Sequence, residues 1–496
     1  MTIFALNNSI ESVNLVWLKR DLRTSDHEAL FHAENQKEDY LIIYLFEPSL
    51  ITYKDVSERH LQFIYHSLKD MNNFLSPFNR NIHIFHGDAT KIFEFLISNY
   101  KLRNVFSHQE SGTQLTWNRD KNISLLFKKK RIKWREFQAD GVIRGLKNRV
   151  GWDKKWFHYV NKKIFKNKFS LSSLKRIKSD FDFDIKNLPF INEYPSQFQP
   201  AGESYALKYL KSFINERAKN YFRQISSPHK SSISCGRLSP YFSWGNLSIR
   251  IAYQAIRSAP NYISQKQAYD SFLARLKWRS HFIQKFEVDC SYETKCINKG
   301  YDKISYKNND VFLEKWKNGK TGFPLVDASM RCLQHKGWLN FRMRAMLVSF
   351  LCHYIDQDWR RGVYHMAKLF LDYEPGIHYT QFQMQAGVTG INSVRIYNPV
   401  KQSLEKDSKG EFIRNWVPEL RKLPLAFVHR PWKLTPIDLL GGQINLEYVY
   451  PIIDPEKTSL PNRDKLWKLK KDPEVKKESL RLLGVHVRPQ NKKKRK

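Results

Sequence analysis

The sequence predicts two domains of different class, an α/β domain built on a parallel sheet and then an all-α domain. Three observations predict this. The chain has 496 residues, more than one hydrophobic core usually serves. Its first ~140 residues alternate short apolar runs with amphipathic stretches, the pattern of βαβ units. After about Ser204 the apolar residues recur only at helical spacing.

Five apolar runs in the first part predict strands, at 13–17, 40–46, 81–85, 104–107 and 132–137. They are apolar almost without interruption, as expected for strands buried on both faces. Amphipathic stretches such as Glu58–Leu75 and Thr90–Tyr100 lie between them and predict the covering helices. A ligand would bind beyond the carboxyl ends of these strands. No Gly-rich phosphate motif follows any of them, which argues against an ordinary dinucleotide site here.

The rest of the chain divides by pattern. We place the α/β domain at 12–145, a proline-punctuated connector at 146–203, the helical domain at 204–450 and a basic tail at 451–496. The Lys-rich stretch from Asn462 to Lys496 is expected to be mobile, serving as a solvated charge run or as an auxiliary phosphate contact. Helices of the second domain are expected around 246–257, 264–287, 324–336, 339–355 and 362–371.

Charge is the strongest signal of composition. Lys and Arg number 84 against 48 Asp and Glu, a formal charge of +36. Such a field attracts polyanions, so nucleic acid is the first candidate partner. An anionic membrane face or a merely solubilising surface is the alternative.

Cellular context follows from a few absences in the sequence. The five cysteines are too few and too scattered for a disulfide framework, and no zinc-type ligand spacing or other metal motif is present. The first residues do not read as a signal peptide, and no run of 18 apolar residues predicts a membrane span. We therefore expect a monomeric cytoplasmic protein, associated with the bacterial nucleoid through DNA.

Two local sequence patterns indicate possible binding chemistry without reference to any family. Small and polar residues at 235–239 precede Pro240, which marks a helix start whose N–H groups can receive a phosphate or simply be capped. Arg342 and Arg344 fall in an otherwise apolar helix, and a buried arginine needs a partner.

Several motifs, in order, resemble those of photolyases and cryptochromes. The resemblance runs from about Val13 to about Trp432. The motifs are VNLVWLKRDLRTSDHEAL (13–30), GRLSPYFSWGNLS (236–248), WRSHF (278–282), KTGFPLVDASMR (320–331), GWLNFRMR (337–344), DWRRG (358–362), RIYNP (395–399) and EFIRNWVPEL (411–420).

The resemblance implies an FAD site in the helical domain, with Arg344 paired to Asp372 beside the flavin ring. Two positions depart from the common pattern: Cys235 and Gly236 replace a Thr-Ser pair, and Glu374 replaces an Asp. The implied FAD-binding residues are Tyr221, Cys235, Gly236, Arg237, Leu238, Ser239, Arg279, Arg344, Asp372, Tyr373 and Glu374.

Electron transfer and flavin chemistry show further departures. His378 stands where repair enzymes commonly have an Asn at flavin N5; it would act there, or serve only as a hydrogen-bonded core residue. The family's three-Trp chain reads Phe382, Trp359 and Tyr306 from inside to outside, and phenylalanine is hard to oxidise. Trp338 and Tyr379 are candidate substitutes, although core packing explains any of these aromatics equally well.

The implied lesion pocket departs as well. Trp278 matches the aromatic on which flipped-out bases stack, and Arg342 lines the same site. Arg275 replaces a Glu that contacts the lesion, and Phe341 and Met384 replace an Asn and a Trp. Gln402 is assigned to the DNA contact too.

The resemblance thus implies a DNA photolyase that splits pyrimidine lesions in UV-damaged DNA by electron transfer from reduced FAD. A cryptochrome-like photoreceptor and a DNA-binding flavoprotein without repair activity are the alternatives. An antenna chromophore, a folate or another pigment, would bind near His108, Gln109 and Glu110, unless this segment is a loop without a ligand.

Overall fold

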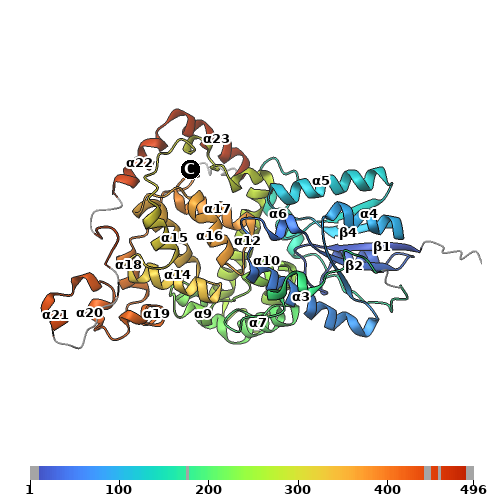
Figure 1. The fold of residues 1–496 in the computed structure, drawn as a ribbon, viewed down its shortest axis with the longest axis horizontal. Helices are drawn as coiled ribbons and strands as arrows, with labels where there is room; N and C mark the ends of the chain where they lie inside the picture. Colours follow the sequence, from blue (N-terminus) through green and yellow to red (C-terminus); the bar gives the residue numbers. More distant parts are fainter. Residues whose placement is uncertain (1–10, 175–177, 441–447, 449, 456–459, 488–496) are drawn as a thin grey trace, which may run out of the picture.

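The computed structural model describes residues 11–487 apart from 175–177, 441–447, 449 and 456–459. It has an α/β domain at one end and a larger assembly of helices at the other (Figure 1). The predicted fold class is therefore confirmed. Of the described helices, none combines the length and apolar character that crossing a lipid bilayer requires.

The sheet has five parallel strands in the order β3-β2-β1-β4-β5. Pairing joins Asn14 to Tyr40, Ile42 to Ile82, and Asn104 to Lys133. All five predicted strands are present within a few residues, and their bounds are β1 Ser12–Leu18, β2 Tyr40–Phe46, β3 Ile82–His86, β4 Lys101–His108 and β5 Lys133–Phe137.

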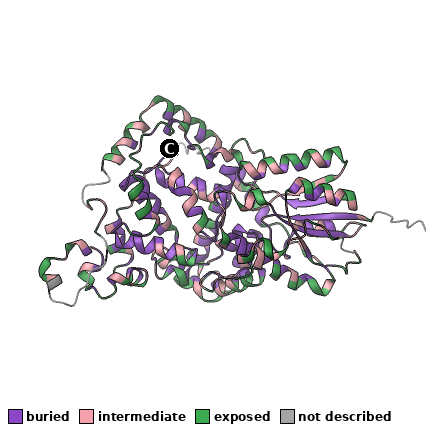
Figure 2. Ribbon diagram, in the orientation of Figure 1, coloured by how far each residue is buried: buried purple, intermediate pink, exposed green. Residues whose placement is uncertain are grey.

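Both faces of the sheet are buried, as the near-continuous apolar runs predict (Figure 2). Leu15 and Trp17 face a core shared with α4 and α5, whereas Val16 and Leu18 face a core shared with α1 and α3. The helices of this part are α1 Glu28–Glu34, α2 Pro48–Ile51, α3 Glu58–Leu75, α4 Ala89–Asn99 and α5 Gln114–Lys129.

The connector contains a helix that was not predicted, α6 Trp152–Val160. Trp152 and Trp156 are buried, and their indole N–H groups donate to Gln284 (3.2 Å) and Ser280 (2.8 Å) of the helical domain. The connector is thus packed against the domain that follows it.

The helical domain holds the expected helices, with one irregularity. The helix expected at 339–355 is α-helical only to Ser349 and continues as a π-helical turn, Phe350–Tyr354. The α-helices are α7 Glu203–Asn215, α8 Tyr221–Gln224, α9 Ser231–Ser234, α10 Ser239–Ser243, α11 Ile249–Arg257, α12 Lys266–Val288, α13 Asp310–Lys317, α14 Pro324–Lys336, α15 Phe341–Ser349, α16 Arg360–Leu369, α17 Pro375–Ala386, α18 Pro399–Lys406, α19 Glu411–Trp416, α20 Leu425–Val428, α21 Pro436–Leu440, α22 Leu460–Lys470 and α23 Pro473–His486.

The expected mobile tail is wrong for residues 460–486, which form α22 and α23. Val475 of α23 is fully buried, and its carbonyl accepts from Asn298 Nδ2 at 3.0 Å. Tyr292 Oη lies 2.9 Å from Nε2 of His486. Apolar residues among the lysines explain the difference, because they give both helices a face to bury. Lys492–Lys496 lie outside the described residues.

The loop after β1 fastens the two domains together. Asp26 is buried and forms an ion pair of 2.8 Å with Arg250 of α11. The N–H of Leu22 donates to the carbonyl of Trp244, and Gly245 has φ +77°. A Cβ on Gly245 would lie 2.2 Å from the carbonyl oxygen of Arg20, so only glycine fits this close approach.

Candidate functional site

The segment Cys235–Ser239 leads into α10 and presents unpaired amides. Arg217 donates to the carbonyls of Cys235 and Gly236, which turns these oxygens to one side. Among the described residues, no acceptor bonds the N–H groups of Gly236, Arg237 and Leu238. Successive free amides of this kind suit an anionic group such as a phosphate.

Close packing explains the Gly that departs from the family pattern. A Cβ on Gly236 would lie 2.8 Å from Cε2 of Phe272 in α12. Arg237 has a left-handed backbone (φ +55°), and its guanidinium lies 4.1 Å from the ring centre of Trp338. Burial raises the pKa of Cys235 to about 12, so this thiol stays protonated.

Arg344 and Asp372 form the predicted ion pair, with contacts of 3.0 Å and 2.7 Å between two guanidinium nitrogens and both carboxylate oxygens. Arg344 also donates to the carbonyl of Leu339 at 2.7 Å. The Asp372 side chain is almost fully buried, so the fork-shaped contact offsets the cost of removing its charge from water.

Arg279 of α12 is buried and reaches two carboxylates. Its Nη2 lies 3.0 Å from Asp140 and 3.3 Å from Glu374, and it donates to the carbonyl of Phe242 at 2.8 Å. Burial raises the pKa of Glu374, and the charges of Arg20 and Arg279 oppose that rise. Asp140 and Arg20 belong to this cluster although sequence reasoning missed them; the RDLR motif at 20–23 was the available signal for Arg20.

Buried donors without a partner mark where a ligand would be accepted. Among the described residues these include Nε of Arg237, Nε and Nη1 of Arg279, and Nε of Arg342. A buried unpaired guanidinium N–H is costly, and an anionic cofactor with many acceptors relieves it. The donor set therefore fits a dinucleotide carrying a pyrophosphate.

His378 lies in an aromatic cluster on α17. Its Nε2 is 2.8 Å from the carbonyl of Val363, so this nitrogen carries the proton and donates it there. Burial lowers the pKa of His378 to about 4, which keeps the ring neutral. The N–H is committed to Val363, so only Nδ1, an acceptor, is left for other contacts.

Two of the three predicted electron-transfer positions, Phe382 and Trp359, lie close together. Trp359 is fully buried, and its ring centre is 6.5 Å from that of Phe382. Tyr306 is half-buried, with the ammonium of Lys465 4.9 Å from its ring centre. Of the candidate substitutes, Trp338 packs on Arg237, and Tyr379 lies beside His378 with a ring separation of 5.5 Å. Tyr221, assigned to the cofactor, is buried against Phe272.

The residues assigned to the lesion differ in exposure. Trp278 is 57% exposed and Phe341 is 51% exposed, which is unusual for such large apolar side chains. Arg275 is exposed; among the described residues its side chain hydrogen-bonds to Ser271 of its own helix, and its guanidinium lies 5.8 Å from the ring centre of Tyr221.

The other members of this set lie deeper. Arg342 reaches Gln402 at 3.4 Å, and Met384 is half-buried. The assigned contact positions therefore run from solvent towards the interior.

Two family models match the chain over most of its length. The model described as the FAD binding domain of DNA photolyase matches residues 272–468, and the model described as DNA photolyase matches residues 14–145. The chain belongs to the photolyase/cryptochrome family.

Relatives within this family carry two different names. The chain is 27% identical over 470 residues to a deoxyribodipyrimidine photo-lyase of Alkalihalophilus pseudofirmus, which covers 90% of this chain and 96% of the relative. It is 23% identical over 489 residues to a cryptochrome DASH of Gloeobacter violaceus, covering 89% and 93%. The solved class III photolyase from Agrobacterium tumefaciens has a similar fold, with a TM-score of 0.82, 23% identity, and coverage of 94% of this chain and all of that one.

FAD is the cofactor of this family's helical domain, and the domain is present here. The free amides after Cys235, the Arg344–Asp372 pair and the unpaired donors of Arg279 lie within or just before the matched region. The residues present thus fit the group that the family model implies.

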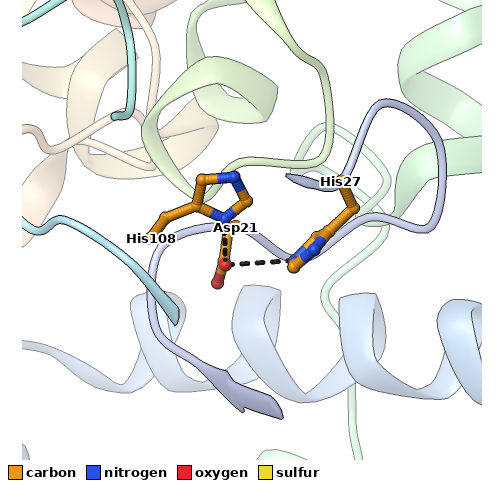
Figure 3. Close-up of side chains that lie close together, drawn as sticks. All are labelled: Asp21, His27 and His108. Atoms are coloured by element: carbon orange, nitrogen blue, oxygen red, sulfur yellow. Dashed lines mark hydrogen bonds and ion pairs between the residues drawn. The ribbon is translucent and has the colours of Figure 1, made fainter. Parts of the chain in front are cut away.

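The expected antenna segment splits among three surroundings. Glu110 lines a cavity of about 110 Å³ between the sheet and the helical domain, where Arg119 holds it at 2.7 Å. Gln109 lines an open groove of about 700 Å³ beside α6. His108 points into a buried cluster with Asp21 and His27 (Figure 3).

The Asp21 cluster was not anticipated from the sequence. Oδ2 of Asp21 lies 2.7 Å from Nδ1 of His108 and 3.1 Å from Nε2 of His27, and its Oδ1 accepts from the N–H of Lys19. Nδ1 of His27 accepts from the N–H of Leu30, so its proton is on Nε2, facing Asp21. A metal ion bound to Nε2 of His27 would displace the proton from that nitrogen. The proton could not move to Nδ1, because Nδ1 already accepts from the N–H of Leu30. We therefore interpret the three groups as a hydrogen-bonded set.

Proposed function

We propose that this protein is a DNA photolyase that binds UV-damaged DNA and splits pyrimidine dimers under blue light. One observation carries the proposal: Trp278 and Arg279, which are neighbours on α12, differ sharply in exposure. Trp278 is 57% exposed, whereas Arg279 is buried against Glu374, and its Nε and Nη1 have no hydrogen-bond partner among the described residues. A base stacked on Trp278 would lie within one helix diameter of the cofactor site.

The chain's residues would divide the work as follows. When bound, FAD supplies the light-absorbing group and the transferable electron. Arg344, fixed by Asp372, and Arg279, fixed by Glu374, would orient the cofactor and balance its charge. Trp278 and Phe341 would stack flipped-out bases, and Arg342 with Gln402 would hydrogen-bond them.

Charge supports the DNA assignment. The formal charge of +36 provides many phosphate contacts, and exposed Arg275 is free of any carboxylate among the described residues. Such binding would hold the protein on chromosomal DNA.

A cryptochrome-like receptor is the second candidate, and Arg275 favours it. An arginine cannot give up a proton to a lesion, in contrast to the carboxyl group that the repair pattern has at this position. The relatives named cryptochrome DASH agree with this alternative.

A repair assay tests the proposal. Purified protein, chemically reduced with dithionite, is mixed with an oligonucleotide carrying one cyclobutane dimer, in blue light and in darkness. We expect lesion loss only in the light. Binding of the oligonucleotide with no light-dependent loss would reject repair and favour a DNA-binding flavoprotein without repair activity.

We further propose that an antenna chromophore binds in the groove lined by Gln109 rather than in the cavity lined by Glu110. Ligand pockets usually exceed ~300 Å³, which the groove does and the cavity does not. The groove is lined by Arg144, Lys154, Lys155 and Lys162, which suits a pigment with carboxylates or phosphates. Replacing Lys154 and Lys155 by Glu should abolish fluorescence enhancement of an added folate, and unchanged binding would refute this placement.

A further inference from the structure

A pair of buried tyrosines shares one carboxylate at the interface between the domains. The hydroxyl groups of Tyr373 and Tyr379 both donate to Oδ2 of Asp55, the latter at 3.2 Å. The two hydroxyl oxygens are 3.2 Å apart. Asp55 follows α2 in the α/β domain, whereas both tyrosines belong to the helical domain, so the contact crosses the interface.

A second pair repeats this arrangement nearer to solvent. Tyr364 of α16 and Tyr53 donate to the same oxygen, Oε1 of Glu293, at 2.9 Å and 2.6 Å. Both tyrosines are half-buried. The ammonium of Lys54, whose side chain is 47% exposed, lies 3.8 Å from Glu293 and 4.2 Å from the ring centre of Tyr364.

The two pairs are joined by ring contacts. Ring centres are 6.4 Å apart between Tyr373 and Tyr379, and 6.1 Å apart between Tyr379 and Tyr364. At the inner end, His378 lies 5.4 Å from Tyr373 and 5.7 Å from Phe382. Aromatic rings therefore follow one another from His378 to Tyr364, and the shared carboxylate of Glu293 links Tyr364 to Tyr53.

We propose that Tyr379, Tyr364 and Tyr53 form an electron-transfer chain that reduces the flavin under light. Asp55, which Tyr373 also holds by a hydrogen bond, and Glu293 serve as the proton acceptors. The proposal rests on FAD binding in the matched domain and deepens the proposed function. It gives the protein a route for reducing the flavin that does not require oxidation of Phe382.

The steps balance in electrons and protons. With FAD bound and excited by light, Tyr379 would give up one electron to the cofactor and its hydroxyl proton to Asp55, and would become a neutral phenoxyl radical. Tyr364 then gives one electron to that radical and its proton to Glu293, while Asp55 returns its proton to Tyr379. Tyr53 then gives one electron to the Tyr364 radical and its hydroxyl proton to Glu293, while Glu293 passes the proton it already held to Tyr364. A soluble thiolate finally gives one electron to the Tyr53 radical and leaves as a thiyl radical, while Glu293 returns its proton to Tyr53.

The carboxylates are the essential part of this arrangement. A tyrosine is oxidised at accessible potentials only if its proton leaves with the electron, so each needs a base within hydrogen-bond distance. Burial raises the pKa of Asp55, and hydrogen bonds from the two tyrosines oppose that rise. A raised pKa makes a buried carboxylate a better proton acceptor.

The competing explanation is that Asp55 only ties the domains together. The two explanations predict different results for Tyr379→Phe, Tyr53→Phe and Asp55→Asn in the FAD-loaded protein. The matched control is Tyr269→Phe, which also removes a buried hydroxyl with two acceptors, Ile214 O and Asn261 Oδ1. Trp359→Phe serves as the variant for the family's route.

The measurement follows loss of oxidised-flavin absorbance in blue light with dithiothreitol present. We expect Tyr379→Phe and Asp55→Asn to slow it at least about tenfold, which corresponds to ~1.4 kcal/mol of barrier. Tyr269→Phe and Trp359→Phe should match the parent chain. Flash excitation should give a tyrosyl radical signal in the parent, slower to appear in D2O and absent in Tyr379→Phe.

Parent-like photoreduction and an unchanged radical signal in Tyr379→Phe would overturn the chain. Tyr53→Phe is a second variant that is less prone to misfolding, because Tyr53 is half-exposed. If this variant keeps the parental FAD content, slower decay of the tyrosyl radical supports the electron-transfer chain. Radical decay at the parental rate counts against it. Lesion repair measured after dithionite reduction needs no photoreduction. If reduced Tyr379→Phe still repairs the lesion, the proposed function stands whether or not the electron-transfer chain exists. If the reduced parent protein does not repair the lesion, the proposed function alone is rejected.

Discussion

Arg344 and Asp372 meet through both carboxylate oxygens, at 3.0 Å and 2.7 Å, at the centre of the predicted flavin site. Arg344→Met should destabilise the fold by about 3 kcal/mol, because it leaves a buried carboxylate without its partner. Urea unfolding of the FAD-free protein measures this. The double variant Arg344→Met/Asp372→Asn should recover much of the loss; no recovery would show that the pair is not the cause.

Trp278 provides a test of DNA contact that is separate from folding. Because its side chain is 57% exposed, Trp278→Ala should leave the unfolding midpoint unchanged. It should weaken binding to dimer-containing DNA by about 1–3 kcal/mol, the usual value of a base–aromatic stack. Trp467→Ala on α22, also about half exposed, is the control and should bind normally. Equal losses in both variants would contradict a specific stack.

The basic charge predicts strong salt dependence. Each phosphate contact releases counterions, so the logarithm of DNA affinity should fall linearly with the logarithm of salt concentration. For six or more contacts the affinity should drop by about 10³ or more between ~50 mM and ~200 mM salt. Fluorescence anisotropy with a labelled duplex measures the slope, and a flat response would exclude DNA as the partner of this charge.

His378 predicts loss of stability in acid. Burial lowers its pKa from 6.5 to about 4 in the folded protein, so between these values the unfolded chain takes up a proton that the native state does not. The contribution is complete above pH 6.5 and is lost as pH falls, by up to ~1.4 kcal/mol per pH unit.

His378→Gln should flatten this slope, since glutamine does not titrate and keeps a donor for the carbonyl of Val363. Urea unfolding at neutral and acid pH measures the slope. The exposed His158→Gln is the comparison, and an equal slope in all three proteins would show that His378 is not the source.

The docked helix α23 can be tested at Gly300. An added Cβ there would lie 2.7 Å from Cγ2 of Val475 and 2.9 Å from its backbone. Gly300→Ala should therefore loosen α23, and limited trypsin digestion should cut the lysine-rich C-terminal helices faster than in the parent. Gly145→Ala adds a Cβ with no atom within 4 Å and serves as the control for a glycine-to-alanine change, although Gly145, unlike Gly300, has a positive φ. Identical digestion rates would mean that α23 is not held at this contact.

The sequence was informative wherever a local pattern carried the information. Strand β2 and helix α3 have the predicted bounds, because alternation and helical spacing are properties of neighbouring residues. The Arg344–Asp372 pair followed from the family motifs. The π-helical turn at Phe350–Tyr354 could not be predicted in this way, since it depends on packing around the helix end.

Contacts between distant segments were missed for a physical reason. Asp55 meets Tyr373 and Tyr379 across more than 300 residues, and no spacing rule relates them. The same holds for Asp21 and His108, which meet because β1 and β4 are neighbours in the sheet. Helix α6 is different, because a local signal was available: its buried residues Trp152, Trp156, Tyr159 and Val160 recur at helical spacing.

The loop that follows β1 affects how this protein unfolds. Val16 and Leu18 of the sheet share one continuous core with helices as distant as α12, and the Asp26–Arg250 ion pair is buried within that junction. Neither half keeps a complete apolar interior without the other. Heating should thus produce a single cooperative transition, and the first 145 residues expressed alone should lack the autonomy that their separate family model suggests.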